Sequence, residues 1–220
     1  MDTIKKQIVV GNAVHNVLMA YPSCNETRIN SIIGKKIEGI KVEVKRAKED
    51  YKKISKKNDL NICEIFLLDN GRSIIKKSEE AINRFKEINF LEIVERSMKK
   101  NEICIGRIDE GNLRVMDRIE IGVIKNLFYN LIEEDIYEYL RRIRRKRINI
   151  DINNITEEYI NISKLSVTSK KYIDILLEVP CDTLRQWRKF RNNKKKLPAS
   201  DYLEGIVNSY NYELNQYYGW

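Results

Sequence analysis

The sequence is poor in the residues that break a chain, cross-link it or most often carry catalysis. Its 220 residues include only nine glycines and three prolines. This low density argues against sandwiches and barrels, which need many tight turns, and favours long helices. The four cysteines are too far apart for a C-x-x-C metal knuckle, and a chain of this size with 42% hydrophobic residues needs no disulfides for its core. We therefore expect free thiols in a reducing compartment.

Histidine and phosphate-binding glycine motifs are nearly absent as well. The single histidine, His15, argues against a metal site or proton relay built on histidine, and we interpret it as a partly buried structural side chain in a helix. No G-x-G-x-x-G occurs. Two G-x-x-x-x-G spacings begin at Gly34 and Gly106, but Ile40 and Asn112 follow them where a phosphate loop needs lysine. We predict no cofactor and no metal ligands.

Long apolar runs are also missing. No stretch approaches the roughly 18 apolar residues of a membrane span. Charged and polar residues interrupt the first twenty positions, so these do not resemble a secretion signal. We expect a protein that is made and kept inside the cell.

Positive charge, by contrast, is in excess. The chain has 41 lysines and arginines against 32 aspartates and glutamates, a formal net charge of +9. Such a surface attracts anions, so polyanionic partners have to be considered. Two runs are basic without a compensating acid, residues 141–147 and 185–196.

Hydrophobic periodicity predicts a mainly α-helical protein with a small β hairpin, organised as a single domain over residues 1–220. Asn70-Gly71 is a candidate break in the third helix. Alternating apolar residues between 103 and 124, around Asp109-Glu110-Gly111, are the one convincing β signal. The predicted helices cover residues 3–20, 35–57, 62–85, 88–100, 135–145, 156–162, 168–179, 181–191 and 200–217.

The second basic run lies in two predicted helices separated by Pro180. This pair resembles a helix-turn-helix of the excisionase type. The side chains that would contact DNA are Thr183, Arg185, Gln186 and Arg188. Leu184, Trp187 and Phe190 on one face of the second helix fit a packed helical hairpin with a cationic outer face equally well. The spacing alone leaves both interpretations open.

Five segments follow one another in a distinctive order over most of the chain. They are GKKIEGIKVEVKRAKEDYKKISKKN, IFLLDNGRSIIKKSEEAINRF, FLEIVERSMKKNEICIGRIDEGNLRV, EEDIYEYLRRIRRKRINIDI and YIDILLEVPCDTLRQWRKFRNNKK. Together they resemble the C-terminal lobe of the CotS-type spore coat proteins of endospore-forming bacteria, relatives of the aminoglycoside phosphotransferase and choline kinase fold. The resemblance implies the helical lobe of a kinase-like fold, in which both basic runs belong to scaffold helices.

The catalytic loop departs from the family pattern. In the family it reads His-Gly-Asp, with an Asn five residues later; the Asp accepts the substrate hydroxyl proton and the Asn holds a metal ion. The corresponding residues here are Ile105, Gly106, Arg107 and Asn112. Arginine cannot act as a general base, and losing a positioned base costs about 10²- to 10⁴-fold in rate. A second metal-binding Asp would fall near residues 121–125, where no carboxylate occurs.

We also expect the nucleotide-binding lobe to be absent, because the first helices already resemble the second lobe. The resemblance thus implies a non-catalytic relative with a vestigial loop at Gly106, Arg107 and Asn112. Its role would be structural or interactive in the spore coat, after synthesis in the mother-cell cytoplasm, with other coat proteins or anionic surface polymers as partners. Two alternatives stay open, a DNA-binding regulator and an active phosphotransferase completed by a separately encoded first lobe.

Overall fold

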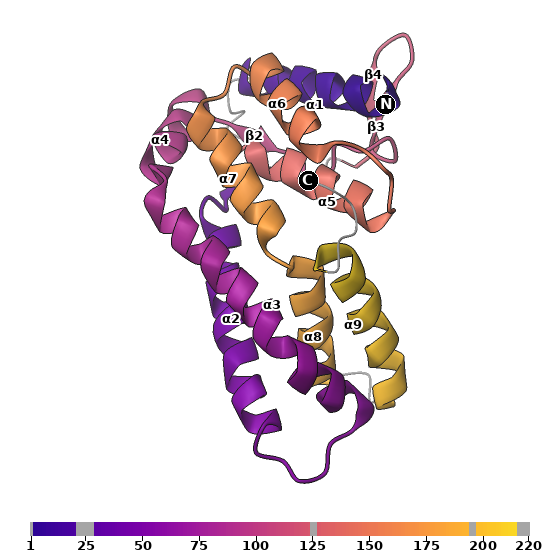
Figure 1. Ribbon diagram of the computed structural model, residues 1–220. Coiled ribbons are helices and arrows are strands. Elements are labelled where there is room, and N and C mark those ends of the chain that lie inside the picture. The colour runs from indigo at the N-terminus through magenta and orange to yellow at the C-terminus, as the bar shows by residue number, and fades with distance from the viewer. Residues whose placement is uncertain (1, 21–28, 124–126, 194–196, 215–220) are drawn as a thin grey trace. The chain divides into compact units, whose positions relative to one another are not determined.

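The computed structural model describes residues 2–20, 29–123, 127–193 and 197–214. The chain forms two compact units (Figure 1). Unit 1 contains residues 1–34 and 87–176, and unit 2 contains residues 35–86 and 177–219. The single domain expected over residues 1–220 stays a prediction.

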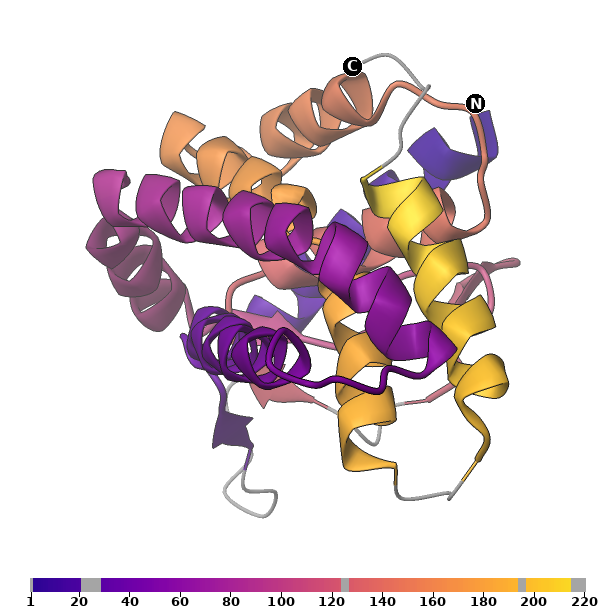
Figure 2. The ribbon, with the colours of Figure 1, turned by 60° about the horizontal axis from the view of Figure 1, so that its bottom comes forward.

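Unit 2 consists of helices in the part that the structure describes. They are α2 (Lys35–Ile54), α3 (Ile62–Glu87, whose last residue belongs to unit 1), α8 (Cys181–Asn192) and α9 (Ala199–Glu213). The last two form a helical hairpin, and Figure 2 shows them side by side. In α9 the buried Glu213 carboxylate accepts hydrogen bonds from the Asp182 and Thr183 N–H groups, at 2.8 Å each. These two groups lie in the first turn of α8, so Glu213 caps it.

The third helix passes through the middle of unit 2 without a break. A side chain at Gly71 would place its Cβ 2.9 Å from a Tyr51 ring carbon and 3.0 Å from a Trp187 ring carbon. The glycine therefore lets α2 and α8 approach α3 closely, and it does not interrupt the helix as the sequence had suggested. On the same helix, the Phe66 ring packs edge to face on the Tyr210 ring of α9, with ring centroids 5.5 Å apart.

Unit 1 is mainly helical too, with two small sheets. Its helices are α1 (Asp2–Ala20), α4 (Phe90–Lys100), α5 (Glu133–Arg145), α6 (Ile152–Ile162) and most of α7 (Val167–Glu178). The three strands of one sheet are β1 (Asn30–Ser31), β5 (Phe128–Tyr129) and β2 (Ile103–Cys104), in that order, with β1 parallel and β2 antiparallel to β5. None of the described helices is long and apolar enough to cross a membrane.

The predicted hairpin exists, but its turn lies elsewhere. Strands β3 (Leu113–Val115) and β4 (Ile119–Ile121) pair antiparallel, so the chain reverses at residues 116–118. The segment Asp109-Glu110-Gly111 instead belongs to the loop that leads from β2 to β3. The Asp109 carboxylate accepts a hydrogen bond from the Gly111 N–H at 3.0 Å, and the Asp109 carbonyl accepts from Asn112 and Leu113. These local bonds close a turn within the loop without pairing two strands.

Two of the cysteines are buried thiols. Cys63 and Cys104 are free, as predicted, and Cys24 lies outside the described residues. The Cys63 thiol donates to the Ala199 carbonyl at 2.9 Å. Burial, with a smaller contribution from Glu64, raises the pKa of Cys63 to about 11. Burial also raises the pKa of Cys104 well above its usual value. Both thiols are therefore inert at neutral pH, as expected of structural cysteines.

Candidate functional site

The loop at residues 105–112 of unit 1 is the candidate site that the sequence singled out. One carboxylate holds its start. Asp135, in the first turn of α5, accepts hydrogen bonds from the Ile105 and Gly106 N–H groups, at 2.9 Å each. Its Oδ2 also lies 2.9 Å from Nε2 of His15. The Asp135 and His15 side chains are 3% and 0% exposed, so the anchor is shielded from water.

Helix α1 fixes the end of the same loop. Gln7 donates from Nε2 to the Ile108 carbonyl at 2.7 Å and to the Leu113 carbonyl at 3.3 Å. One turn further along, a Cβ at Gly11 would lie 3.2 Å from Cδ1 of Ile108. That separation is tighter than ordinary van der Waals contact, so the missing side chain at this position lets the helix lie close against the loop.

Gly106 supplies the backbone shape of the loop. Its φ angle is +72°, in the left-handed region that side chains disfavour, although nothing lies within 4 Å of where a Cβ would be. Glycine is therefore favoured here by the backbone conformation and not by a lack of room for a side chain. The following turn positions Arg107 at the surface, with a side chain 48% exposed.

Arg107, at the position where the family resemblance places the catalytic base, forms an ion pair. Its Nη2 and Nε donate to the Asp109 carboxylate at 2.9 and 3.2 Å, and Arg142 of α5 pairs with the same carboxylate. Burial opposes ionisation of Asp109, but the two arginines and the Gly111 N–H outweigh it and lower the pKa of this carboxyl. The Asp109 partner in turn raises the pKa of Arg107. The loop thus presents a fixed cation where a base would be needed.

Asn112 is buried, and both ends of its amide bind loop backbone. Its Nδ2 donates to the Arg107 carbonyl at 2.8 Å, and its Oδ1 accepts from the Val123 N–H at 2.8 Å. The side chain is only 2% exposed. The asparagine therefore links the loop to the segment after β4 and has a structural task in this conformation.

The donor groups of the loop do not fit Mg²⁺, the ion on which phosphoryl transfer depends. Of its two carboxylates, Asp109 is held by two arginines and Glu110 accepts a hydrogen bond from the Tyr139 hydroxyl at 3.1 Å. The Asn112 oxygen accepts a backbone hydrogen bond. Nowhere in the described ranges do three His, Cys, Asp or Glu side chains gather as metal ligands. Of the segment where a second metal-binding Asp was sought, residues 124–126 lie outside the described residues.

A second polar cluster supports the same region from α4. Arg96 donates to both oxygens of Glu102, at 2.9 Å each, and to both of Glu133, at 2.7 and 2.8 Å. It also donates to Ser169 at 2.8 Å. Burial lowers the pKa of Arg96, but the two carboxylates more than offset this and raise it. Both glutamate side chains are 0% exposed, so Arg96 is the counter-charge of two buried anions.

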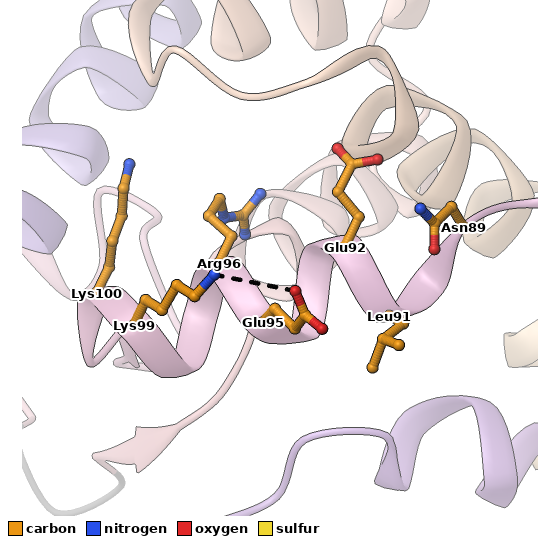
Figure 3. Close-up of a pocket in the computed structure, with 7 residues that line it drawn as sticks. All are labelled: Asn89, Leu91, Glu92, Glu95, Arg96, Lys99 and Lys100. Atoms are coloured by element: carbon orange, nitrogen blue, oxygen red, sulfur yellow. Dashed lines mark ion pairs between the residues drawn. The ribbon is translucent and has the colours of Figure 1, made fainter.

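The outer side of α4 carries a shallow pocket, drawn in Figure 3. Leu91 at its edge is 63% exposed, and Lys99 lies 4.0 Å from Glu95. Arg96 also lines it, but its guanidinium is engaged by Glu102, Glu133 and Ser169. We assign no catalytic or binding role to this pocket.

The side chains proposed to contact DNA are engaged within unit 2. Thr183 is buried and donates to Glu213 at 2.7 Å. Arg185 pairs with Asp182 at 2.8 Å, and Arg188 with Glu43 of α2 at 3.5 Å. Gln186 packs on α9, where a Cβ at Gly205 would lie 3.3 Å from its amide. These four side chains are thus engaged in contacts inside unit 2, and DNA binding stays a prediction.

Sequence reasoning did not find the groups that hold the loop. Gln7 and Asp135 lie in helices, where polar residues are ordinarily solvated, and their loop partners are backbone atoms. The run Glu133-Glu134-Asp135 opens a helix, where acids are ordinarily solvated, yet all three residues are buried.

Comparison with known proteins supports the fold. No family model matches the chain, and no curated protein matches it in sequence. Among solved structures, it is similar to an aminoglycoside phosphotransferase from Alicyclobacillus acidocaldarius, with a TM-score of 0.69 and 11% identity. The match covers 96% of this chain but 64% of that one. The chain thus has the predicted helical, kinase-like architecture and spans less than two thirds of its neighbour's length.

Proposed function

We propose that this protein is a non-catalytic relative of the phosphotransferase-like fold and acts as a structural or interaction protein. The observation that carries the proposal is the state of the loop. Arg107 stands at the position of the base and is ion-paired with Asp109. The Asn112 amide forms hydrogen bonds with backbone groups of Arg107 and Val123. At these two positions the loop therefore offers neither a base that accepts a proton nor an unengaged oxygen that ligates Mg²⁺.

More specifically, we propose a role in the spore coat. It rests on the resemblance of the five ordered segments to CotS-type proteins. Such a role needs a stable surface more than turnover, which fits a loop fixed by ion pairs and hydrogen bonds. The protein would be made in the mother cell and deposited on the spore, against coat proteins or anionic polymers.

The catalytic part is tested with purified protein, ATP, Mg²⁺ and a panel of aminoglycosides. We expect no phosphoryl transfer above the uncatalysed rate. Arg107→Asp should stay inactive as well, because a base alone supplies only about 10²- to 10⁴-fold and the second metal ligand is still missing. Wild-type transfer that disappears in Asn112→Ala would show a working site and overturn the proposal.

The coat part is tested in sporulating cells of an endospore-forming bacterium that expresses a fluorescently tagged chain. We expect the fluorescence to collect on the forming spore and to stay on purified spores. A tagged chain that remains diffuse in the mother cell through spore release would refute the coat role. Because this readout is independent of phosphoryl transfer, the two parts of the proposal can fail separately.

A further inference from the structure

The net charge of the chain is concentrated in unit 2. Unit 2 has 22 lysines and arginines against 14 acids, whereas unit 1 has 19 against 18. Unit 2 therefore carries +8 of the +9. The basic run 141–147 does not produce this excess, because unit 1 balances it; Arg141, for example, pairs with Glu138, and Arg142 with Asp109.

Half of this excess, +4, lies on α2, which has eight lysines and arginines against four acids. Two of the acids of this helix, Glu43 and Asp50, are engaged by α8: Arg191 lies 2.5 Å from the first and 3.4 Å from the second. Because these carboxylates offset the charge of α8, they do not pair with the lysines on the other face of α2. That face lines a groove whose other wall is α3, and Figure 1 shows both helices.

Four lysines follow the groove along α2. Lys41, Lys45, Lys48 and Lys52 recur at steps of four, three and four residues, so they share one helix face over about 16 Å. Lys48 pairs with Glu79 across the groove, and Lys41 with Glu38 on its own helix. Among the described residues, no ion pair forms at Lys45 or Lys52, and both side chains are exposed.

We propose that this α2–α3 groove docks an acidic segment of a partner polypeptide. Its Lys45 and Lys52 ammonium groups would receive two carboxylates of the partner. These residues are seven positions apart, about 10 Å along the axis, which matches the spacing of acids two turns apart on a docked helix. The docking site depends on the charges of unit 2 and not on the loop of unit 1, so it is independent of the proposed function.

The composition of the groove favours a polypeptide over a nucleic acid. Glu49 and Glu79 line it together with the lysines. A phosphodiester chain bears a negative charge at every unit and would be repelled at these points, whereas a polypeptide can place a neutral or basic residue there. None of the residues lining the groove is aromatic, so bases of a single strand would have nothing on which to stack.

The test uses a fluorescent helical peptide of about 20 residues, with glutamates seven positions apart and leucines beside them, in fluorescence anisotropy titrations. We expect the wild-type chain to bind it and Lys45→Glu/Lys52→Glu to bind at least about tenfold more weakly. Lys56→Glu/Lys189→Glu is the matched control. It makes the same change in net charge at exposed positions outside the groove, and we expect less than about a twofold loss.

Three results would overturn the assignment. Equal losses in both double variants would mean that only the overall field attracts the peptide. Tighter binding of an oligodeoxythymidine or a DNA duplex than of the peptide, lost in Lys45→Glu/Lys52→Glu, would assign the groove to nucleic acid. No binding of the peptide by the wild-type chain at low salt would remove the docking site. Circular dichroism verifies that each variant is folded, and Lys45→Gln/Lys52→Gln repeats the test without added negative charge.

Discussion

Replacement of Asp135 by alanine should lower the free energy of unfolding by about 3–5 kcal/mol. The substitution removes the acceptor of the Ile105 and Gly106 N–H groups and the partner of His15. Each buried donor left without an acceptor costs about 1–3 kcal/mol, and water does not reach these groups easily. Urea unfolding followed by circular dichroism measures the loss, and hydrogen exchange at Ile105 and Gly106 localises it.

The control for this variant is Asp174→Ala. Asp174 also lies in a helix of unit 1, but its side chain is 28% exposed and pairs with Lys170 one turn away, at 2.9 Å. Such a surface pair contributes about 0.3–0.5 kcal/mol, so its loss should be small. If the two alanine variants were equally stable, Asp135 would not be the anchor of the loop.

Replacement of Arg96 by methionine should be similarly costly, about 3–5 kcal/mol. The methionine fills much of the volume, but Glu102 and Glu133 are left as two buried carboxylates without a counter-charge. The triple variant Arg96→Met/Glu102→Gln/Glu133→Gln removes the uncompensated charges as well. We expect it to recover more than half of the lost stability in the same urea experiment, because amides are cheaper to bury than carboxylates.

The same arginine-to-methionine change at Arg84 is the comparison. Arg84 pairs with Glu178, but the two side chains are 49% and 34% exposed, so water replaces the lost partner. The expected cost is below about 1 kcal/mol. A triple variant at position 96 that is no more stable than the single one would show that lost packing, and not buried charge, explains the effect.

Most helices of the fold could be predicted from the sequence because their apolar periodicity is strong. The helix at residues 35–57 is found as Lys35–Ile54, and that at 88–100 as Phe90–Lys100. Gly71 misled the prediction, since local propensity does not reveal that two aromatic rings of other helices occupy the space of its side chain. The turn at Asp109 was misassigned for a related reason: turn residues indicate a reversal but not which strands it joins.

The candidate site could be predicted only in part. The aligned motif located Gly106, Arg107 and Asn112, and the structure brings them into one loop. Gln7 and Asp135, which hold that loop, lie 101 and 30 positions from their partners Ile108 and Ile105 in the sequence. His15 in turn contacts Asp135. No local pattern encodes such pairings, because they arise only once α1 and α5 are packed.

Unit 2 is built from two segments that are far apart in the sequence, so it cannot be completed until most of the chain has been synthesised. Its first helix pair, α2 and α3, leaves the ribosome before the whole of residues 87–176, and α8 and α9 follow only afterwards. During this interval Phe66 of α3 lacks the Tyr210 ring of α9, and the Trp187 ring of α8 is missing beside Gly71. Closing so long a loop is slow, and exposed apolar surface promotes aggregation. A nascent chain halted before residue 177 should therefore be a substrate for chaperones or proteases, while the many lysines of α2 help to keep it soluble.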